Sequence, residues 1–524
     1  MQKATLLLVL LILSNLSFAQ NHLGEDLNKL ELFLKSLDQR YVDSVSTSEI
    51  VEKGMRSMLK ELDPHSVYFS PKQYTAANEP LKGQFKGIGI RYQVIADTLT
   101  VIQVLDGSPA VKGGLEIGDQ LIAIGLDTLS GKKLGSKAMS EYIKDPDNSD
   151  MAFTVNRQSE ILNPVLERGN ISVSSVPAYF MLSEKVGYIK LNRFSSTSLN
   201  DFRDAIDHLK LEGMEGLVFD LRGNSGGYLN VAIKIIDEFL EDRKLIVYTE
   251  GTHQNKKETF ATSGGRFTKG DLVVLIDEKS ASASEIVAGA VQDWDRGLIV
   301  GRRSYGKGLV QRTIEYQDGS AMRLTISRYY TPTGRSIQRS YADGVDAYRK
   351  DLSERKKHGE FYSKDSMQID TNMVYFTPLR RKVYGGGGIV PDVFIGVDTG
   401  NPNPIWGQLN RTNLHYLFAL NFERDNRAAL KSQFPIIREY TEGFEFTKED
   451  MSKLDAMFKN RGLEYSDDDY STVYHYIENS LKGLVARFGY GYSDQYYYVE
   501  SKDRAVKKAI EIIETDYLSE IGLK

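Results

Sequence analysis

The period of apolar and polar positions changes sharply between Asp271 and Trp294, and this change predicts a strand followed at once by a helix. Residues 271–277 are mostly Val, Leu and Ile, the profile of a strand buried on both faces. From Ser282 the apolar residues recur at helical spacing, at Ile286, Val287, Ala290, Val291 and Trp294. A run of small residues therefore joins a buried strand to a helix that starts near Ser282.

The position of Ser282 admits two interpretations. On a sharp turn beside a helix N-terminus, its hydroxyl would have backbone N–H groups close by that point to where an oxyanion forms. Alternatively, the segment from Ser282 to Glu285 is a capping box, in which each residue satisfies a backbone N–H of the other. Taken alone, this motif favours the cap.

Two further segments change the balance. A short apolar strand, residues 298–300, precedes a glycine-rich segment in which Lys307 stands between two glycines and Gln311 follows four residues later. Upstream, an apolar strand starting at Gly216 ends in the turn Asp-Leu-Arg-Gly-Asn-Ser-Gly-Gly, which closes at Gly227.

Together the three segments resemble a carboxy-terminal processing peptidase, the tail-specific family of serine–lysine endopeptidases. The family pattern consists of D-L-R-x-N-x-G-G, S-A-S-A-S-E and G-K-G-x-x-Q, with the lysine 25 residues after the serine, and all three match here in order. The resemblance covers roughly residues 25 to 395. It implies these roles: Ser282 as nucleophile, Lys307 as general base, Gln311 orienting the lysine, and the backbone N–H groups of Gly227 and Ala283 as the oxyanion hole.

Hydrolysis of a peptide bond needs an activated nucleophile, and the sequence contains no cysteine. A thiol nucleophile, thiolate metal sites and disulfides are therefore excluded. Lys307 can act as a base only when neutral, so we expect burial to lower its pKa from about 10.4. No metal-binding cluster and no cofactor motif is recognisable. His65, in the segment Asp-Pro-His-Ser, is predicted to be structural.

Residues 83–168 show short strands separated by glycine turns and resemble a PDZ domain. The ordered series G-I-G-I, S-P-A and G-D-x-L carries this resemblance. It implies that Gly87, Ile88, Gly89 and Ile90 form the loop that binds the carboxylate of a peptide C-terminus beside an open strand edge. Residues 138–144 would form the helix that lines the peptide groove.

Composition limits the remaining classes. The chain has 524 residues, of which 41% are hydrophobic and 26% charged, with a formal net charge of −5. Without a broad basic field, nucleic acid is not an expected partner. Residues 1–19 read as a signal peptide, with Lys3, an apolar run and Ser-Phe-Ala before the cleavage site. We expect an exported, periplasmic protein without a transmembrane segment in its mature form.

The predicted fold class is α/β: a crotonase-like serine–lysine peptidase core with an inserted PDZ domain, N-terminal helices and a helical C-terminal extension. Alternating strands and helices after Val186 predict a largely parallel sheet. The expected boundaries are residues 1–19 for the signal peptide, 20–78 for the N-terminal helical region, 79–168 for the PDZ domain, 169–400 for the core and 401–524 for the extension.

Three segments have weaker signals. The polar stretch 252–269 is predicted to be a surface loop. A charged insertion at about residues 338–384 is either regulatory or substrate-facing or, as its charge favours, a solvated helix. Tyrosines crowd residues 488–498, which favours a packed edge over a binding site for a partner or glycan.

The sequence thus predicts an exported serine endopeptidase that binds substrate C-termini through its PDZ domain and cleaves by a Ser–Lys dyad through an acyl-enzyme. The expected partners are proteins or peptides with free, apolar C-termini; self-association and an adaptor protein stay open. Two rival classes are a non-catalytic peptide-binding scaffold and an apolar-ligand carrier. Retention of Ser282, Lys307 and Gln311 argues against both.

Overall fold

The computed structural model describes residues 23–523 except 96, 126, 130–142, 144–149, 399–403, 464, 516, 521 and 522. The chain divides into two compact units, Met1–Lys72 with Gln311–Thr325 and Gln73–Val310 with Ile326–Lys524. The expected signal peptide lies outside the described residues. So does the expected groove helix, apart from residue 143.

The first unit contains two N-terminal helices and a short strand that pairs with the segment around residues 321–323. A helix covers residues 23–40, and α2 (Thr47–Lys60) follows, capped by the Ser46 hydroxyl, which accepts from the Glu49 N–H. Strand β1 (Val67–Phe69) pairs antiparallel with the start of β19 (Ala321–Tyr330). The predicted apolar face of the first helix is exposed, including Leu27 and Phe33.

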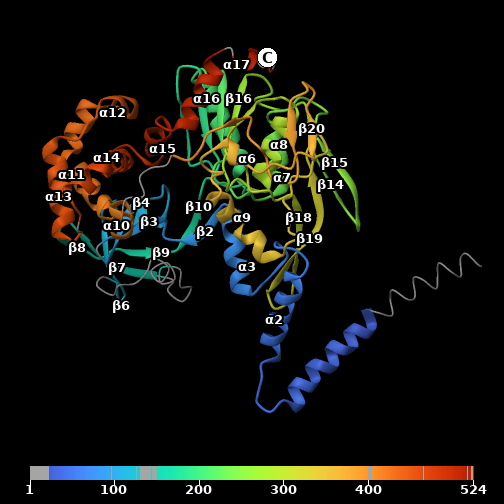
Figure 1. Cartoon of the computed structure of the whole chain (residues 1–524). Coiled ribbons are helices and arrows are strands. Elements are labelled where there is room, and N and C mark those ends of the chain that lie inside the picture. Colours follow the sequence, from blue (N-terminus) through green and yellow to red (C-terminus); the bar gives the residue numbers. More distant parts are fainter. Residues whose placement is uncertain are drawn as a thin grey trace, which may run out of the picture. The chain divides into compact units, whose positions relative to one another are not determined.

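The second unit is built around a sheet of strand order β11-β12-β13-β16-β17-β22. Strands β12 (Val186–Lys190), β13 (Gly216–Asp220), β16 (Asp271–Ile276), β17 (Leu298–Gly301) and β22 (Val393–Phe394) run parallel, and β11 (Ala178–Met181) is antiparallel to β12. The predicted α/β class and the largely parallel sheet are confirmed (Figure 1).

Helices cover both faces of this sheet because successive strand residues point to opposite sides. On one side, Leu272, Val274 and Ile276 of β16 pack against α6 (Ser198–Leu211), α7 (Leu229–Asp237) and α8 (Ala283–Asp293). On the other side, Val273 and Leu275 pack against α16 (Arg504–Glu514). The end of the C-terminal extension therefore completes the core.

One predicted loop is a strand. Within residues 252–269, β15 (Gln254–Phe260) pairs antiparallel with β14 (Leu245–Gly251), and β14 also pairs with the end of β19. The sequence Gln-Asn-Lys-Lys-Glu-Thr-Phe has an exposed side chain at nearly every position. It therefore lacks the apolar alternation from which a strand is predicted.

A separate antiparallel sheet spans the region predicted to be PDZ-like. Its strands are β3 (Ile90–Ile95), β4 (Thr98–Val104), β5 (Gln120–Ile124), β7 (Asp150–Arg157) and β8 (Glu160–Leu162), with β6 (Asp127–Thr128) beside β5 and β9 (Val165–Glu167) beside β7. The short helix α4 (Pro109–Lys112) begins at the S-P-A motif. Its Ala110 N–H donates to the Ile88 carbonyl at 2.9 Å, so the helix closes onto the G-I-G-I loop.

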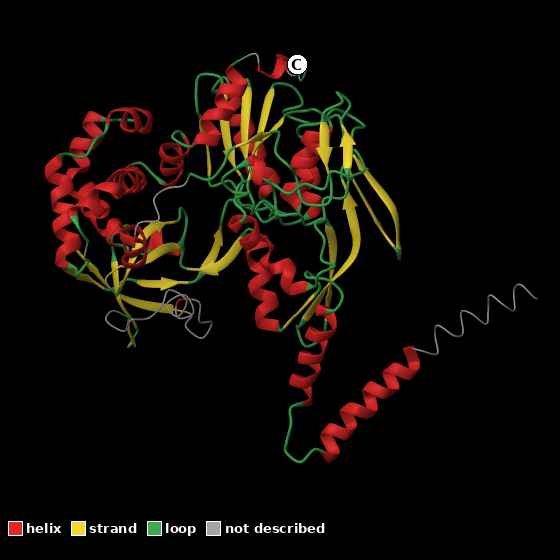
Figure 2. Cartoon of the chain, viewed as in Figure 1, coloured by secondary structure: helices red, strands yellow, loops and turns green. Residues whose placement is uncertain are grey.

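The C-terminal extension is helical, as predicted, with α10 (Pro404–Thr412), α11 (Leu414–Gln433), α12 (Ile437–Gly443), α13 (Lys448–Asn460), α14 (Asp467–Gly489), α15 (Tyr492–Glu500), α16 and α17 (Tyr517–Glu520) (Figure 2). Its apolar core includes Ile95 and Ile102 from β3 and β4. Asn413 also donates from its side chain to the Val94 carbonyl at 3.1 Å. No helix among the described residues is long and apolar enough to cross a membrane.

The charged insertion does form a helix, α9 (Val345–Lys357), but the prediction of a solvated helix is wrong for two of its side chains. Tyr348 and Arg355 are buried. Arg355 donates to the Ser304 carbonyl at 3.0 Å and to the Arg303 carbonyl at 2.8 Å, and it pairs with Glu360. The insertion thus packs onto the segment that leads to Lys307.

Candidate active site

Ser282 lies at the junction that the sequence predicted, between the end of β16 and the start of α8. Its backbone has φ 54° and ψ −110°, a left-handed conformation that is unusual for a residue other than glycine. Such a conformation costs on the order of 1–3 kcal/mol and persists only where surrounding contacts impose it. The Glu285 half of the capping box is present: its carboxylate accepts from the Ser282 N–H at 2.8 Å, while the Glu285 N–H donates to the Ser282 carbonyl at 2.9 Å. Cap and nucleophile are therefore compatible roles for this turn.

The glycine turn after β13 packs directly on the serine. The Ala281 N–H donates to the Asn224 carbonyl at 3.0 Å. A Cβ on Gly226 would lie 2.9 Å from the Ser282 Cβ, and a Cβ on Gly227 would lie 2.1 Å from the Phe194 carbonyl oxygen. With φ values of 101° and 152°, both positions require glycine. The glycines thus let the backbone of this turn approach Ser282 and Ala283 closely.

Glu285 connects the serine turn to the lysine segment. Its Oε2 accepts from the Ser282 N–H at 2.8 Å and from the Lys307 N–H at 2.9 Å. Its Oε1 accepts from the Gly306 N–H at 2.6 Å and from the Ser304 hydroxyl at 2.5 Å. Burial raises the pKa of Glu285, while these hydrogen bonds act in the opposite direction by stabilising the carboxylate.

Tyr329 makes a second connection between the same two segments. Its hydroxyl lies 2.7 Å from the Lys307 carbonyl oxygen and 3.2 Å from the Ser282 carbonyl oxygen. Burial and then the nearby Glu285 carboxylate raise the pKa of Tyr329 well above its usual value, so the hydroxyl keeps the proton that it donates. The backbones of Ser282 and Lys307 are therefore held by one carboxylate and one hydroxyl.

The other predicted site residues are placed as follows. Lys307 is half-buried in the segment before β18 (Leu309–Glu315). Gln311 belongs to the other compact unit, where its Nε2 donates to the His65 carbonyl at 2.5 Å. The orienting role of Gln311 stays a prediction. His65 has a structural contact, since its N–H donates to the Asp63 carboxylate at 2.7 Å.

A buried charge cluster lies at the first residues of the glycine turn. Asp220 accepts from Lys190 at 3.1 Å and from the Tyr188 hydroxyl at 2.8 Å. Arg222 pairs with Asp220 at 2.6 Å. Burial opposes ionisation of Asp220, but Arg222 and then Lys190 outweigh it and hold its pKa far below the usual range. Two acidic residues of the C-terminal extension complete the cluster, Glu500 and Asp503, both paired with Arg222.

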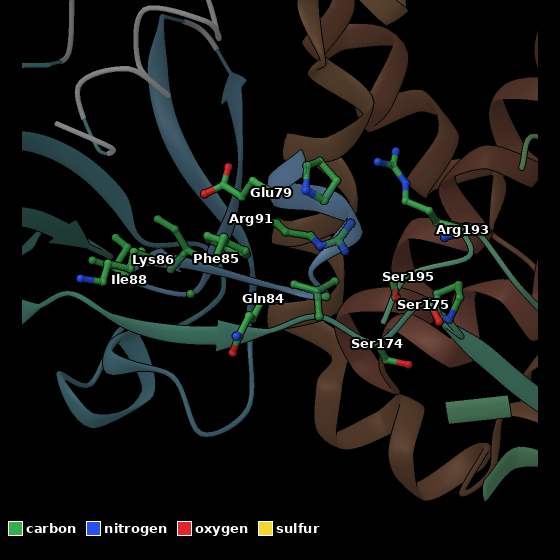
Figure 3. Close-up of a pocket in the computed structure, with 18 of the residues that line it drawn as sticks. Glu79, Gln84, Phe85, Lys86, Ile88, Arg91, Ser174, Ser175, Arg193 and Ser195 are labelled. Carbon is green, nitrogen blue, oxygen red and sulfur yellow. The ribbon is translucent and has the colours of Figure 1, made fainter. Parts of the chain in front are cut away.

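A pocket of about 450 Å³ lies at the G-I-G-I segment. Gly87, Ile88, Gly89 and Ile90 line one part of it, and their role in binding substrate stays a prediction. Ser174, Ser175, Arg193 and Ser195 of the core region line another part (Figure 3). Phe194 lies between the lining residues Arg193 and Ser195 in the chain, and its backbone bridges to Gly227, which links this side of the pocket to the glycine turn.

No group of His, Asp and Glu side chains able to hold a metal ion is found among the described residues. The sequence did not reveal that Glu285 accepts from the Lys307 segment as well as from Ser282, or that Tyr329 contacts both segments. The Glu285 capping motif is local, whereas its other partners lie about 20 residues further on and carry no pattern that points back to it.

Comparison with known proteins agrees with these segments. Residues 185–347 match the model of peptidase family S41. A carboxy-terminal-processing protease from Bartonella bacilliformis is 35% identical over 306 residues, which cover 57% of this chain and 69% of that protein. The chain belongs to the carboxy-terminal-processing protease family. A probable CtpA-like serine protease from Staphylococcus aureus is 33% identical over 319 residues, 60% of this chain but only 62% of that protein.

The comparisons also mark the extension. Residues 405–491 match a family of unknown function, DUF8443. Among solved structures, a photosystem II D1 C-terminal processing protease aligns with 70% of this chain and 86% of its own at 23% identity and a TM-score of 0.36. A likeness at that TM-score carries no weight for the activity of this chain.

Proposed function

We propose that this family member is an exported serine endopeptidase that cleaves peptide bonds with a Ser282–Lys307 dyad. The observation that carries the proposal is the double attachment of the two backbones: Glu285 accepts from the N–H groups of both residues, and Tyr329 contacts both carbonyl oxygens. Such supports fix a nucleophile and its base on rigid segments. A merely structural serine and a surface lysine need no such supports.

In the first chemical step, neutral Lys307 removes the proton of Ser282 while the serine Oγ bonds to the substrate carbonyl carbon. The lysine then gives this proton to the leaving amine as the C–N bond breaks, which leaves an acyl-enzyme. In the second step, the same lysine takes a proton from a water molecule while the water oxygen bonds to the ester carbon. As the C–Oγ bond breaks, the lysine returns this proton to the Ser282 Oγ, and the product leaves with a new terminal carboxylic acid that ionises in solvent. Atoms and protons balance without a metal or cofactor.

Charge develops on the carbonyl oxygen in both steps. The Ala283 N–H is at the first position of α8, where the helix dipole favours negative charge. The Gly227 N–H is the proposed second donor. Its turn packs on Ser282 through Gly226, and the close approach of these backbones supports the assignment.

Substrate tails would bind in the pocket at Gly87–Ile90, with the terminal carboxylate on the loop N–H groups and the peptide extending the sheet at β3. Apolar lining by Ile88, Ile90 and Ile143 favours an apolar terminal residue. This assignment rests on the PDZ-like motif order and on the pocket.

The alternative of a non-catalytic binding scaffold would leave the Ser282 turn without a reason for its conformation. A left-handed serine held by a buried carboxylate is costly, and binding tails at the Gly87–Ile90 pocket would not use it. The serine turn therefore favours the enzyme.

The deciding experiment compares purified wild type, Ser282→Ala and Ser452→Ala on an unstructured peptide with a free apolar C-terminus. Ser452 is an exposed serine of α13 and serves as the matched control. We expect Ser282→Ala to remain folded and to lose turnover, and Ser452→Ala to keep it. Native turnover by Ser282→Ala would reject the proposal.

Tail recognition is tested separately with the same peptide carrying a C-terminal amide. The amide lacks the negative charge but retains every internal cleavage site. We expect kcat/KM to fall for the amidated form when substrate is far below saturation. Equal cleavage of both forms would remove the tail-binding role while leaving the dyad intact.

A further inference from the structure

The helix α15, Tyr492–Glu500, presents one face to two different parts of the proposed machinery. Tyr492, Tyr496 and Glu500 are spaced four residues apart, which places them on one side of the helix with ends about 12 Å apart. The sequence signalled only a crowd of tyrosines. The structure gives each of these three residues a specific neighbour.

At the first end, Tyr492 contacts Arg91 of β3. The Arg91 guanidinium lies 4.9 Å from the Tyr492 ring centroid, and its Nη1 is 3.4 Å from the Tyr492 hydroxyl. A second guanidinium, that of Arg487, also lies 4.9 Å from this ring. Arg91 lines the pocket at the G-I-G-I loop, where Figure 3 labels it. One end of α15 therefore supports a wall of the proposed tail pocket.

In the middle, Tyr496 meets the core. Its ring packs edge-on against Tyr492 with centroids 5.4 Å apart. Its hydroxyl lies within hydrogen-bonding reach of the side chains of Tyr492 and Asn192. Asn192 follows β12 and lines the same pocket from the core side.

At the other end, Glu500 holds the glycine turn. Its Oε2 accepts from Arg222 Nη2 at 2.5 Å, and the next acidic residue, Asp503, lies 2.9 Å from Arg222 Nη1. Arg222 is the arginine of the D-L-R-x-N-x-G-G turn that ends at Gly227. Both side chains of the Glu500–Arg222 pair are largely buried, so the pair is screened little by solvent.

The opposite side of α15 is packed rather than free. The Tyr497 ring lies edge-on to Phe180 of β11 with centroids 5.1 Å apart. Tyr498 is 2% exposed in the core of the extension. Because α15 is packed on both sides, a displacement of the residues at one end is transmitted to the residues at the other end.

From these contacts we propose that α15 is a strut that holds the tail pocket and the oxyanion turn in fixed relation, with Glu500 as a positioning residue for catalysis. This rests on the proposed function of both sites. The strut would give the C-terminal extension a part in the reaction. Tyr492 contacts Arg91 in the pocket wall, and Glu500 fixes Arg222 at the start of the turn that ends at Gly227.

The test is a double-mutant cycle with Tyr492→Leu, Glu500→Gln and the double variant. Glu500→Gln leaves Arg222 paired with Asp220 and Asp503, so we expect the fold to persist. Matched controls are Tyr498→Phe, which loses only a hydrogen bond to Asn479 inside the extension, and Glu511→Gln on exposed α16 surface. The substrate is the free-acid peptide, and tail affinity is measured as Kd on the Ser282→Ala background.

We expect each test variant to lower kcat roughly 5- to 50-fold, with the Kd of the tail peptide changed less than about threefold. Because both residues act through one helix, the double variant should lose no more than the more impaired single variant. The controls should keep kcat. A kcat within about twofold of wild type for either test variant, a loss confined to Kd, or losses that multiply in the double variant would overturn the strut. Should one of these outcomes occur while Ser282→Ala is inactive, the strut is rejected and the proposed function stands. Should Ser282→Ala itself keep native turnover, the proposed function is rejected.

Discussion

The carboxylate of Glu285 lies 2.9 Å from the backbone nitrogen of Lys307, and the oxygen that accepts this bond also accepts from Ser282. Because the acceptor is fully buried, each N–H that it satisfies would otherwise be a buried donor without a partner. The relative placement of the serine turn and the lysine segment therefore depends on this side chain, together with the Tyr329 hydroxyl that contacts the carbonyl oxygens of both residues. The two oxygens of Glu285 accept from four donors, one on the serine turn and three on the lysine segment.

We predict that Glu285→Gln lowers kcat on the order of 10²-fold, with tail-peptide Kd retained. The carboxamide would direct an NH₂ group at N–H donors, so one of the two segments has to move, and small misplacements of reacting groups cost about that factor. Steady-state kinetics and Kd on the Ser282→Ala background measure this. Ser304→Ala removes one of the four donors to Glu285, and also the acceptor of the Ile389 N–H, but it leaves the bonds from Ser282 and Lys307 in place, so its kcat should fall less. Equal losses in both variants would contradict the linking role.

Lys307→Arg tests the base. Arginine stays protonated in proteins, so this variant retains a positive charge but has no neutral amine to accept the Ser282 proton. We expect turnover to be nearly abolished while peptide binding persists, and wild-type kcat to rise with pH as the lysine loses its proton. Undiminished turnover by Lys307→Arg would refute the general-base assignment.

Much of this site was predictable because its signals are local. The strand of residues 271–276 and the helix from residue 283 follow from apolar period alone, and glycines mark the turn that ends at Gly227 and the segment around Lys307. The support from Tyr329 was not predictable, since its hydroxyl meets Ser282 from 47 residues away. Long-range hydrogen bonds leave no period in the sequence.

Long-range contacts that leave no pattern in the sequence also explain two wrong predictions. Strand β15 is polar except for the exposed Phe260 at its end, so pairing with β14 rather than burial determines its structure. The insertion helix α9 was expected to be solvated because its composition is charged. Charge did not reveal that Arg355 turns inward to carbonyl groups of the lysine segment.

Arg355 therefore gives a third prediction. Arg355→Met removes donors from the carbonyl oxygens of Arg303 and Ser304, which lie just before Lys307. Unpaired buried acceptors cost about 1–3 kcal/mol of unfolding free energy, and we expect kcat to fall as well. Glu360 keeps Arg303 as a partner, so the chain should still fold. Chemical denaturation and kinetics measure both effects.

The matched control is Lys357→Met at the exposed end of the same helix, where only a pair with Glu354 is lost. It should leave stability and kcat near wild type. If Arg355→Met is destabilised but turns over normally, the insertion supports the fold and not the lysine segment.

The last prediction concerns pH and Glu500. Burial raises the pKa of Glu500 from 4.5 to about 7, against the lowering effect of Arg222; Asp220 and Asp503 add repulsion, and Lys190 also favours the carboxylate. Burial is the main cause of the raised pKa of Tyr496, and the charge of Glu500 raises it further. Three carboxylates thus share two cations, and the charge on Glu500 is the one most easily lost near neutral pH.

The sign for stability comes from linkage. The folded pKa lies above the unfolded one, so the folded state binds the proton more tightly, and this contribution is complete below about pH 4.5 and lost as pH rises through about 7. The Tm difference between wild type and Glu500→Gln should therefore shift against wild type as pH rises from about 4.5 to about 7, and should stay constant above pH 7. Catalysis should respond in the opposite sense, because only the ionised carboxylate holds Arg222 by charge. The ratio of wild-type to Glu500→Gln kcat should therefore rise as pH increases from 6 to 8, measured at saturating substrate. A ratio that stays constant from pH 6 to pH 8 would show that the negative charge of Glu500 does not affect catalysis through the glycine turn.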